Sequence, residues 1–177
     1  LGNPRLQAPV VADAGFVASG LARNGLQAAK DMFEAATGLG NVMSSDVDWV
    51  TAIGSENEFT ILRTTIKNHG CCGHIFASLD GLLTLQREHK FQASDVSEIC
   101  IGGYSATIDV TGNYICHDAS SAKFCLPFVL ASGLIHGSIR LDAYSQSRLS
   151  DPTVLDLMQK VKMFIDDEVE SLFPAQR

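Results

Sequence analysis

The sequence predicts an α+β fold in which helices cover a sheet, with an αα-hairpin in front of it. Short runs rich in β-branched and apolar residues alternate with longer stretches at helical spacing between residues 59 and 169. One helical stretch, residues 122–135, is apolar on nearly every side, which is typical of a buried helix. Residues 11–36 add two short helical patterns upstream. These observations together indicate helices packed over one face of a sheet.

The first predicted part, residues 1–40, is an αα-hairpin that forms the edge of a helical domain. Small and apolar residues trace a helical face over residues 11–22, and Gly25 should end this helix. Residues 26–36 form the second short helix. The chain holds little material against which these helices can bury their faces. We therefore expect them to pack on another chain or on another part of a larger assembly.

The second predicted part, residues 41–58, is a mixed polar linker, and the third, residues 59–177, is the α+β domain. Its expected elements are, in order, a strand at 59–67, a helix at 74–88, a strand at 96–103, a segment at 104–110 that continues this strand or pairs back on it, a helix at 122–135, a helix at 152–160 and a strand at 161–169. Pro127 should kink the apolar helix or lie in its first turn. Asp151 and Pro152 read as an N-cap followed by proline at the first helical position. The acidic residues that follow position 165 are predicted to form a solvated face.

Charge and composition exclude several classes of function. The chain has 177 residues, and its 20 Asp and Glu against 13 Lys and Arg give a net charge of −7, which argues against a nucleic-acid binder. No apolar run approaches the roughly 18 residues of a membrane span, and no signal peptide opens the sequence. The five cysteines include no CxxC pair. We expect a protein of the cytoplasm or an organellar matrix, not a secreted one, and a processed chain or a piece of a longer protein, since it begins at Leu1.

A basic stretch at residues 61–81 stands out from this acidic background. It has no carboxylate before Asp80 and carries these basic and sulfur-containing side chains: Arg63, Lys67, His69, Cys71, Cys72 and His74. Gly70 and Gly73 form a junction between the predicted strand and the predicted helix. The start of a helix presents N–H groups and the positive end of the helix dipole, which favours a carboxylate or a phosphate. We therefore predict a site for a small anion here. The alternative is that Lys67 is a surface cation and His74 a capping histidine.

The same stretch brings four residues that can bind metal into a short run, namely His69, Cys71, Cys72 and His74. Zinc sites usually take spaced pairs of ligands from two parts of the chain. The second pair here would have to be Cys116 and His117, and two unlike pairs would have to converge. We expect no metal and no other cofactor, and we expect the thiols at 71 and 72 to act as small hydrophobic side chains.

Four motifs in register resemble the MmgE/PrpD family. The run KNHGCCGH at residues 67–74 resembles the lysine, tight turn, cysteine and histidine that open a helix in that family. The run AKFCLPF at residues 122–128 is similar to the family's AKFSLPY helix, and Gly137 and Leu141-Asp142 follow it as they do there. Asp151-Pro152-x-Val154 resembles the start of the next family helix, and residues 6–22 resemble a small-residue helix near the domain boundary.

The family includes 2-methylcitrate dehydratase, cis-aconitate decarboxylase and iminodisuccinate epimerase, and its members share a large helical domain and a smaller α+β lid. The resemblance implies that this chain is the lid with the adjoining helices. A family chain is more than twice as long, and its helical domain supplies an aspartate and histidines of the active site. Pro4 and Arg5 stand where the family has a lysine, and Gly70 stands where the turn usually has a proline.

The resemblance implies a cofactor-independent lyase or isomerase that removes a proton beside a carboxylate of a small polycarboxylate. Lys67 and His74 are the carried-over catalytic candidates, and His69, Arg63, Gly70 and Gly73 are candidates for substrate binding. A second chain or a homo-oligomer would supply the helical domain. The alternative is a non-catalytic partner subunit or scaffold derived from the same family. The sequence does not decide between dehydration, decarboxylation and epimerisation.

Overall fold

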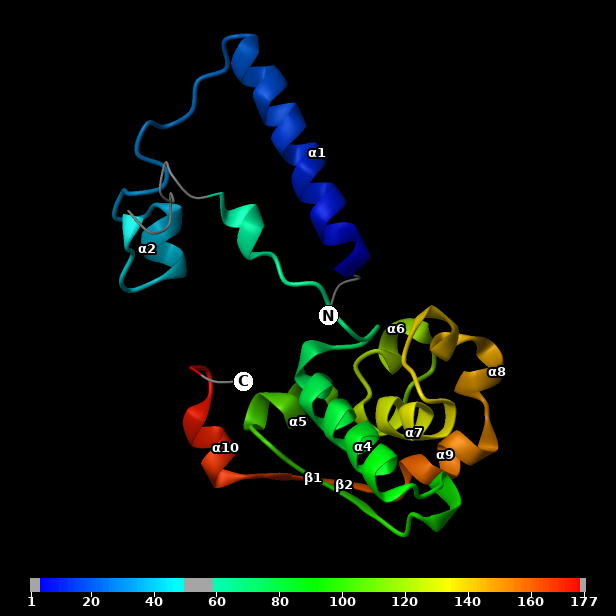
Figure 1. Cartoon of the computed structure of the whole chain (residues 1–177). Coiled ribbons are helices and arrows are strands. Elements are labelled where there is room, and N and C mark those ends of the chain that lie inside the picture. Colours follow the sequence, from blue (N-terminus) through cyan, green and yellow to red (C-terminus); the bar gives the residue numbers. More distant parts are fainter. Residues whose placement is uncertain (1–3, 50–58, 176–177) are drawn as a thin grey trace. The chain divides into compact units, whose positions relative to one another are not determined.

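The structure is a computed structural model and describes residues 4–49 and 59–175 (Figure 1). The chain divides into two compact units, residues 1–64 and 65–177. The α+β class is confirmed, because the structure combines helices with a small two-stranded sheet. The division into hairpin, linker and α+β domain stays a prediction, and residues 50–58 of the predicted linker lie outside the described residues.

The first unit contains one long helix, α1 (Pro4–Arg23), and a short helix, α2 (Leu39–Met43). Gly25, with a φ of 90°, turns the chain after α1, as predicted. The helix predicted at 26–36 is wrong, since this segment forms turns. The carbonyls of Met32 and Phe33 accept hydrogen bonds from Leu39 and Gly40, at 2.9 and 3.0 Å. These carbonyls are therefore engaged by residues seven positions ahead, and a regular helix does not propagate through them.

The first unit also contains a 3-10 turn, η1 (Thr60–Arg63), where the sequence predicts the strand 59–67. That strand prediction is wrong. Ile61, Leu62 and Ile66 are 74, 80 and 93% exposed. Strand propensity reflects packing on a pleated, half-buried surface, and no strand of the described residues pairs with this segment. The β-branched composition alone therefore does not produce a strand here.

The second unit is built on a parallel pair of strands, β1 (Ile99–Gly103) and β2 (Val161–Ile165), in a register that aligns Ile99 with Val161. Its α-helices are α4 (Phe76–His89), α5 (Ser105–Thr111), α6 (Ala119–Ala122), α7 (Leu126–His136), α8 (Gln146–Leu149), α9 (Pro152–Met158) and α10 (Asp167–Leu172). Three 3-10 turns join them: η2 (Gly73–Ile75), η3 (Ala93–Asp95) and η4 (Leu141–Tyr144). Ile99 and Val161 are buried, whereas Phe164 on the opposite face is 50% exposed. Helices therefore cover one face of the sheet, as predicted.

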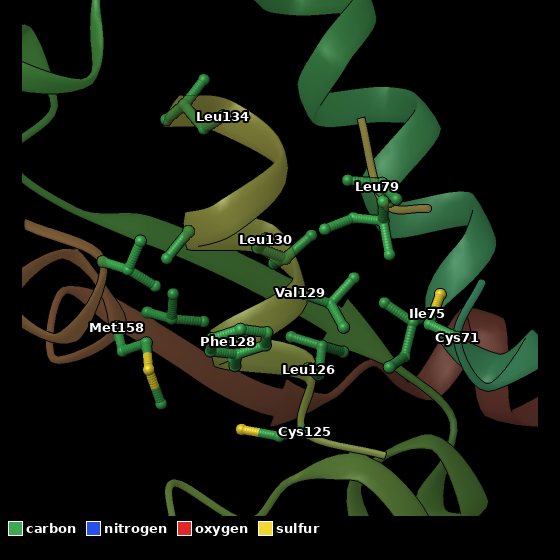
Figure 2. Close-up of a cluster of buried hydrophobic side chains, with 14 of the residues drawn as sticks. Cys71, Ile75, Leu79, Cys125, Leu126, Phe128, Val129, Leu130, Leu134 and Met158 are labelled. Carbon is green, nitrogen blue, oxygen red and sulfur yellow. The ribbon is translucent and has the colours of Figure 1, made fainter. Parts of the chain in front are cut away.

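Helix α7 is the centre of the core. Every residue from Leu126 to Leu134 is buried, which confirms the burial predicted for the apolar helix. Figure 2 shows its side chains packed between Ile75 and Leu79 on one side and Met158 on the other. A methyl group on Gly133 would lie 2.6 Å from Leu79 Cδ1, so the glycine lets α4 and α7 approach closely.

The predicted helix 122–135 is divided into α6 and α7. Pro127 lies in the first turn of α7 and has no N–H, and its ring would clash with the carbonyl four residues earlier in a continuous helix. The chain therefore breaks at residues 123–125 and starts a new helix. Gly137 ends α7 with a φ of 77°, in the left-handed region that glycine favours.

Helix α5 replaces the strand extension or return that the sequence predicts at 104–110. The Glu170 carboxylate accepts hydrogen bonds from the Ser105 backbone N–H at 2.6 Å and from the Ser105 hydroxyl at 2.8 Å. A carboxylate at a helix N-terminus satisfies N–H groups that the helix leaves open and complements the helix dipole. This partner is 65 residues away in sequence, so a local pattern does not show it.

The C-terminal strand is shorter than the predicted 161–169, because Asp166 ends it and caps α10. The Asp166 carboxylate accepts from the backbone N–H groups of Glu168 and Val169, at 3.0 and 3.1 Å. Asp166 and Glu170 thus have structural partners, and the prediction of a purely solvated acidic face is wrong for these two residues. The N-cap predicted at Asp151 is confirmed, since its carboxylate accepts from Thr153 N–H at 2.9 Å.

Replacing Leu130 by alanine should lower the free energy of unfolding by about 2–5 kcal/mol, because the shorter side chain leaves a cavity in the hydrophobic core around α7. Leu130 is fully buried, whereas Leu155 on α9 is 40% exposed. Leu155→Ala is the matched control and should cost less than half as much. Urea unfolding of both variants, followed by circular dichroism, measures the difference. Equal losses would contradict the assignment of α7 as the core.

Candidate active site on the loop before α4

The predicted site residues of the second unit lie on one loop, residues 67–75, which we call the basic loop. Three hydrogen bonds fix its backbone. Gly70 N–H donates to Ile139 O at 2.9 Å, Cys72 N–H donates to Lys123 O at 2.8 Å, and the Tyr144 hydroxyl donates to Gly70 O at 2.9 Å. The loop is therefore attached to the segments on either side of α7 rather than held by its own ends alone.

The hydrogen bond from Cys72 N–H to the Lys123 carbonyl is possible because of Pro127. In a continuous helix, the carbonyl of Lys123 would accept from the N–H of residue 127. Proline has no N–H, so that acceptor is left for another donor. Cys72 supplies it. The proline that divides α6 from α7 thus creates the attachment point of the basic loop.

Two side chains of the loop anchor it in the hydrophobic core. Cys71 is 4% exposed and Ile75 is fully buried, and both belong to the core around α7.

At Gly70 a methyl group would lie 3.3 Å from Ile139 O, so any side chain would press against the carbonyl that holds the loop. Gly73 is different, because a methyl group there would meet no atom within 4 Å. Sterics therefore explain Gly70 but not Gly73, and the predicted substrate-binding role of both stays a prediction.

His74 lies at the α4 end of the loop and contacts Tyr104. Its Nδ1 is 2.5 Å from the Tyr104 hydroxyl, and the two rings meet edge to face with centroids 5.5 Å apart. His74 is half-buried in η2, which packs against α5. The structure thus gives this imidazole a fixed neighbour, which distinguishes it from a mobile surface histidine.

His69 is held differently. Its Nε2 is 2.8 Å from the Asp80 carboxylate on α4, and its ring meets Phe76 edge to face at 5.4 Å. The side chain of His69 is 10% exposed. The ring therefore bridges the loop to the first turns of α4. This contact supports a structural role, and substrate binding by His69 stays a prediction.

Lys67 and Arg63 fall on different sides of the unit boundary. Lys67 is exposed, and its ammonium group donates to the Cys71 carbonyl at 3.4 Å, a long contact. Arg63 belongs to η1 of the first unit. The structure brings Lys67, His69 and His74 onto one loop, and it does not place Arg63 relative to them.

Two buried thiols near the loop, those of Cys71 and Cys125, are poor nucleophiles. Burial raises the pKa of Cys71 to about 12, with a further contribution from the neighbouring Cys72. Burial likewise raises the pKa of Cys125 to about 12. Both thiols are protonated at neutral pH, and the thiolate is the reactive form. This supports the prediction that Cys71 acts as a small hydrophobic side chain.

A groove of about 510 Å³ lies elsewhere, between α4 and β1. Its lining is mainly apolar and comprises Ala77, Ser78, Gly81, Leu82, Leu85, Phe91, Val96, Glu98, Ile99, Cys100, Ile101 and Gly102. The one charged group in that lining is Glu98, which forms an ion pair with Lys162. A groove with a carboxylate and no cation does not suit the small anion that the sequence predicts, so the basic loop remains the candidate site. Across residues 4–49 and 59–175, no three His, Cys, Asp or Glu side chains gather as metal ligands.

Sequence reasoning missed three residues around the loop. Tyr104 contacts His74, Tyr144 donates to Gly70, and Lys123 accepts from Cys72 through its carbonyl while its ammonium group lies 5.2 Å from the centre of the Tyr144 ring. Tyr104 directly follows the end of β1, and a polar aromatic residue at a strand end was the available signal. Tyr144 carried no local signal, since its partner is 74 residues away.

Comparison with known proteins agrees with the motifs. The model of the MmgE/PrpD C-terminal domain matches residues 69–177, and no curated protein matches the chain. The matched region begins two residues after Lys67 and covers His69, His74, α4 and everything that follows. Among the described residues, no helix combines the length and apolar character needed to cross a membrane. The chain belongs to the MmgE/PrpD family.

Proposed function

We propose that the chain is part of a lyase or isomerase that removes a proton beside a carboxylate of a small polycarboxylate. The observation that carries the proposal is the family match over residues 69–177, which contains residues 69–75 of the fixed loop, His74 included. The loop joins basic side chains to the start of α4, whose first turn has no acidic residue. Such a place favours an anionic ligand.

Abstraction of a proton beside a carboxylate moves an electron pair onto that carboxylate and builds negative charge there. Lys67 would stabilise this charge, because an ammonium group aimed at developing charge acts most strongly when it is already in position. The basic loop supports this, since its backbone is fixed by hydrogen bonds to Lys123, Ile139 and Tyr144. The ammonium group lies 3.4 Å from Cys71 O, and this contact keeps it beside the loop.

His74 would take or return the proton, because the pKa of an imidazole ordinarily lies near the operating pH. Loss of water, loss of CO₂ and epimerisation pass through related carbanion-like stages. Loss of water and epimerisation remove a proton, whereas loss of CO₂ leaves a carbanion that takes a proton up. A proton transfer at the carbon beside a carboxylate is therefore shared, and the product stays open. The proposal requires no cofactor.

We propose further that the active protein is an assembly in which another chain, or a second copy, supplies the helical domain. On α1, Val11 and Phe16 are 71 and 82% exposed. Helices with such faces are typical of an interface. The matched region is a C-terminal domain, which also supports a need for further material.

The alternative is a non-catalytic partner subunit, and it is favoured by the fact that the matching family model is that of the C-terminal domain. The two proposals differ in a proton-exchange assay. A catalytic chain should incorporate deuterium from D₂O into 2-methylcitrate, cis-aconitate or iminodisuccinate, or into their products, in the native assembly. A scaffold should bind its partner and leave this exchange unchanged when the basic loop is altered.

Replacing Lys67 by alanine should lower kcat/KM about a hundredfold to a thousandfold, the effect of losing one preorganised donor. Lys162→Ala is the matched control, because it removes a surface lysine whose side chain is 67% exposed. Turnover of the three substrates by the native assembly, followed by NMR, measures both variants, with folding checked by circular dichroism. If Lys67→Ala keeps the wild-type rate on the true substrate, Lys67 is not part of the active site.

Replacing His74 by glutamine should remove the limb of the pH–rate profile that reports an essential imidazole. His89→Gln is the control, since His89 is an exposed residue at the end of α4. Rates between pH 5 and 9 give both profiles. A His74→Gln profile with the wild-type shape would show that another group carries the proton.

A further inference from the structure

The apolar groove between α4 and β1 lies along the edge of β1 that faces away from β2. Within residues 4–49 and 59–175 the sheet consists of β1 and β2, so β1 is paired on one side. The groove is lined by residues 98–102, which include most of β1, and by part of α4. Soluble proteins generally cover the open edge of a strand or protect it with charge. An open edge beside an apolar groove therefore calls for an explanation.

The hydrogen bonds of β1 show which of its backbone groups face the open edge. Ile99 N–H donates to Lys160 O at 2.9 Å, and Gly103 O accepts from the N–H of the residue after β2 at 3.0 Å. In a parallel ladder the N–H and C=O of one residue point to the same side, and those of the next residue point to the other side. The N–H and C=O groups of Cys100 and Gly102 therefore point away from β2, toward the open edge.

Helix α4 exposes apolar surface on its side of the groove. Leu85, which lines the groove, is 50% exposed, and a methyl group on Gly81 would meet no atom within 4 Å. The one charged residue of the lining, Glu98, is already paired with Lys162. A partner in this groove must therefore offer apolar side chains to α4 and needs no charge of its own.

The backbone groups of β1 decide which kind of partner fits. A small apolar molecule would cover the lining and leave the N–H and C=O groups of Cys100 and Gly102 buried without hydrogen bonds, which is costly. A helix has the same fault, because its own N–H and C=O groups are already bonded to each other. An extended segment has free N–H and C=O groups along its edge and side chains on its faces. It satisfies both sides of the groove.

We propose that this groove is a docking site for an extended segment of another polypeptide, which adds to β1 as a third strand. In this mode of recognition, main-chain hydrogen bonds supply affinity and alternate side chains supply specificity. Every second residue of the segment is apolar and faces Leu85 and Gly81 of α4. The basic loop does not line the groove, so the proposal is independent of the proposed reaction.

The test uses the full chain labelled with ¹⁵N and a short acetylated peptide in which valine and threonine alternate between two terminal lysines. The same peptide N-methylated at its valines and threonines is the matched control, because it keeps the side chains and loses the donors of a strand. With the unmethylated peptide, amide exchange of Cys100 and Gly102 should slow roughly tenfold or more. Exchange of Ile101, whose N–H points to β2, should change little.

Substitutions in the chain test the lining and the edge separately. Leu85→Glu should weaken binding of the unmethylated peptide roughly tenfold or more, because it places a charge in the apolar lining. Leu155→Glu is its control, since Leu155 is a 40% exposed helical leucine outside the groove. Cys100→Pro removes an N–H of the open edge and should also weaken binding, whereas Cys100→Ala should not.

Equal binding of the two peptides would overturn the proposal, because the N–H groups of the strand would then contribute nothing. Absence of binding by the unmethylated peptide at about 1 mM would overturn it as well. So would slow exchange of Cys100 and Gly102 in the chain without peptide, because the edge would already be covered. Protection that rises with protein concentration would identify a second copy as the occupant, and protection independent of concentration would identify another part of the same chain.

Discussion

The arrangement of the site depends on one missing N–H group. Pro127 cannot donate to the carbonyl of Lys123, and its ring prevents a helix from passing through that carbonyl. The chain breaks there, and Cys72 N–H takes the vacant acceptor at 2.8 Å. The basic loop is thereby attached to the start of α7, the most buried helix of the second unit. The break in the chain before α7 therefore fixes the position of the basic loop and of its side chains.

Preorganisation is the physical advantage of this attachment. Lys67, His69 and His74 are basic residues of one loop in an acidic chain, and flexible side chains would have to be ordered each time an anion binds. Here the backbone between them is bonded to Ile139, Lys123 and Tyr144, and Cys71 and Ile75 anchor it in the core. Membership of the MmgE/PrpD family and the fixed basic loop both support the proposal that the substrate is an anion.

Much of the second unit could be predicted from the sequence because its signals are local. The burial of α7, its end at Gly137 and the cap at Asp151 follow from composition, glycine and an Asp-Pro pair. The strand predicted at 59–67 failed because strand formation needs a neighbouring strand, which a β-branched run such as Thr64-Thr65-Ile66 does not reveal. Helix α5 was missed because Glu170, its stabilising partner, lies far along the chain.

The features of the site also divide into those that local sequence patterns predict and those that depend on tertiary contacts. His74 and Lys67 could be chosen from the sequence, since basic residues beside glycines before a helix are a local pattern. Tyr104 could not be paired with His74, because the contact spans 30 residues and depends on how α5 packs on η2. The sequence assigned His74 to catalysis and His69 to substrate binding, and only the structure shows that His69 contacts Asp80. Local patterns thus identified the loop, and tertiary contacts give each of its side chains a different environment.

Amide hydrogen exchange tests the attachment of the basic loop most directly. If the N–H groups of Gly70 and Cys72 are bonded to Ile139 and Lys123, they should exchange slowly, as should the N–H of Val129 in α7, which donates to Cys125 O. Asn68, an exposed residue of the same loop, should exchange much faster. Exchange of Gly70 and Cys72 as fast as that of Asn68 would show that the loop is not held by the segments around α7, and would contradict this account of the site.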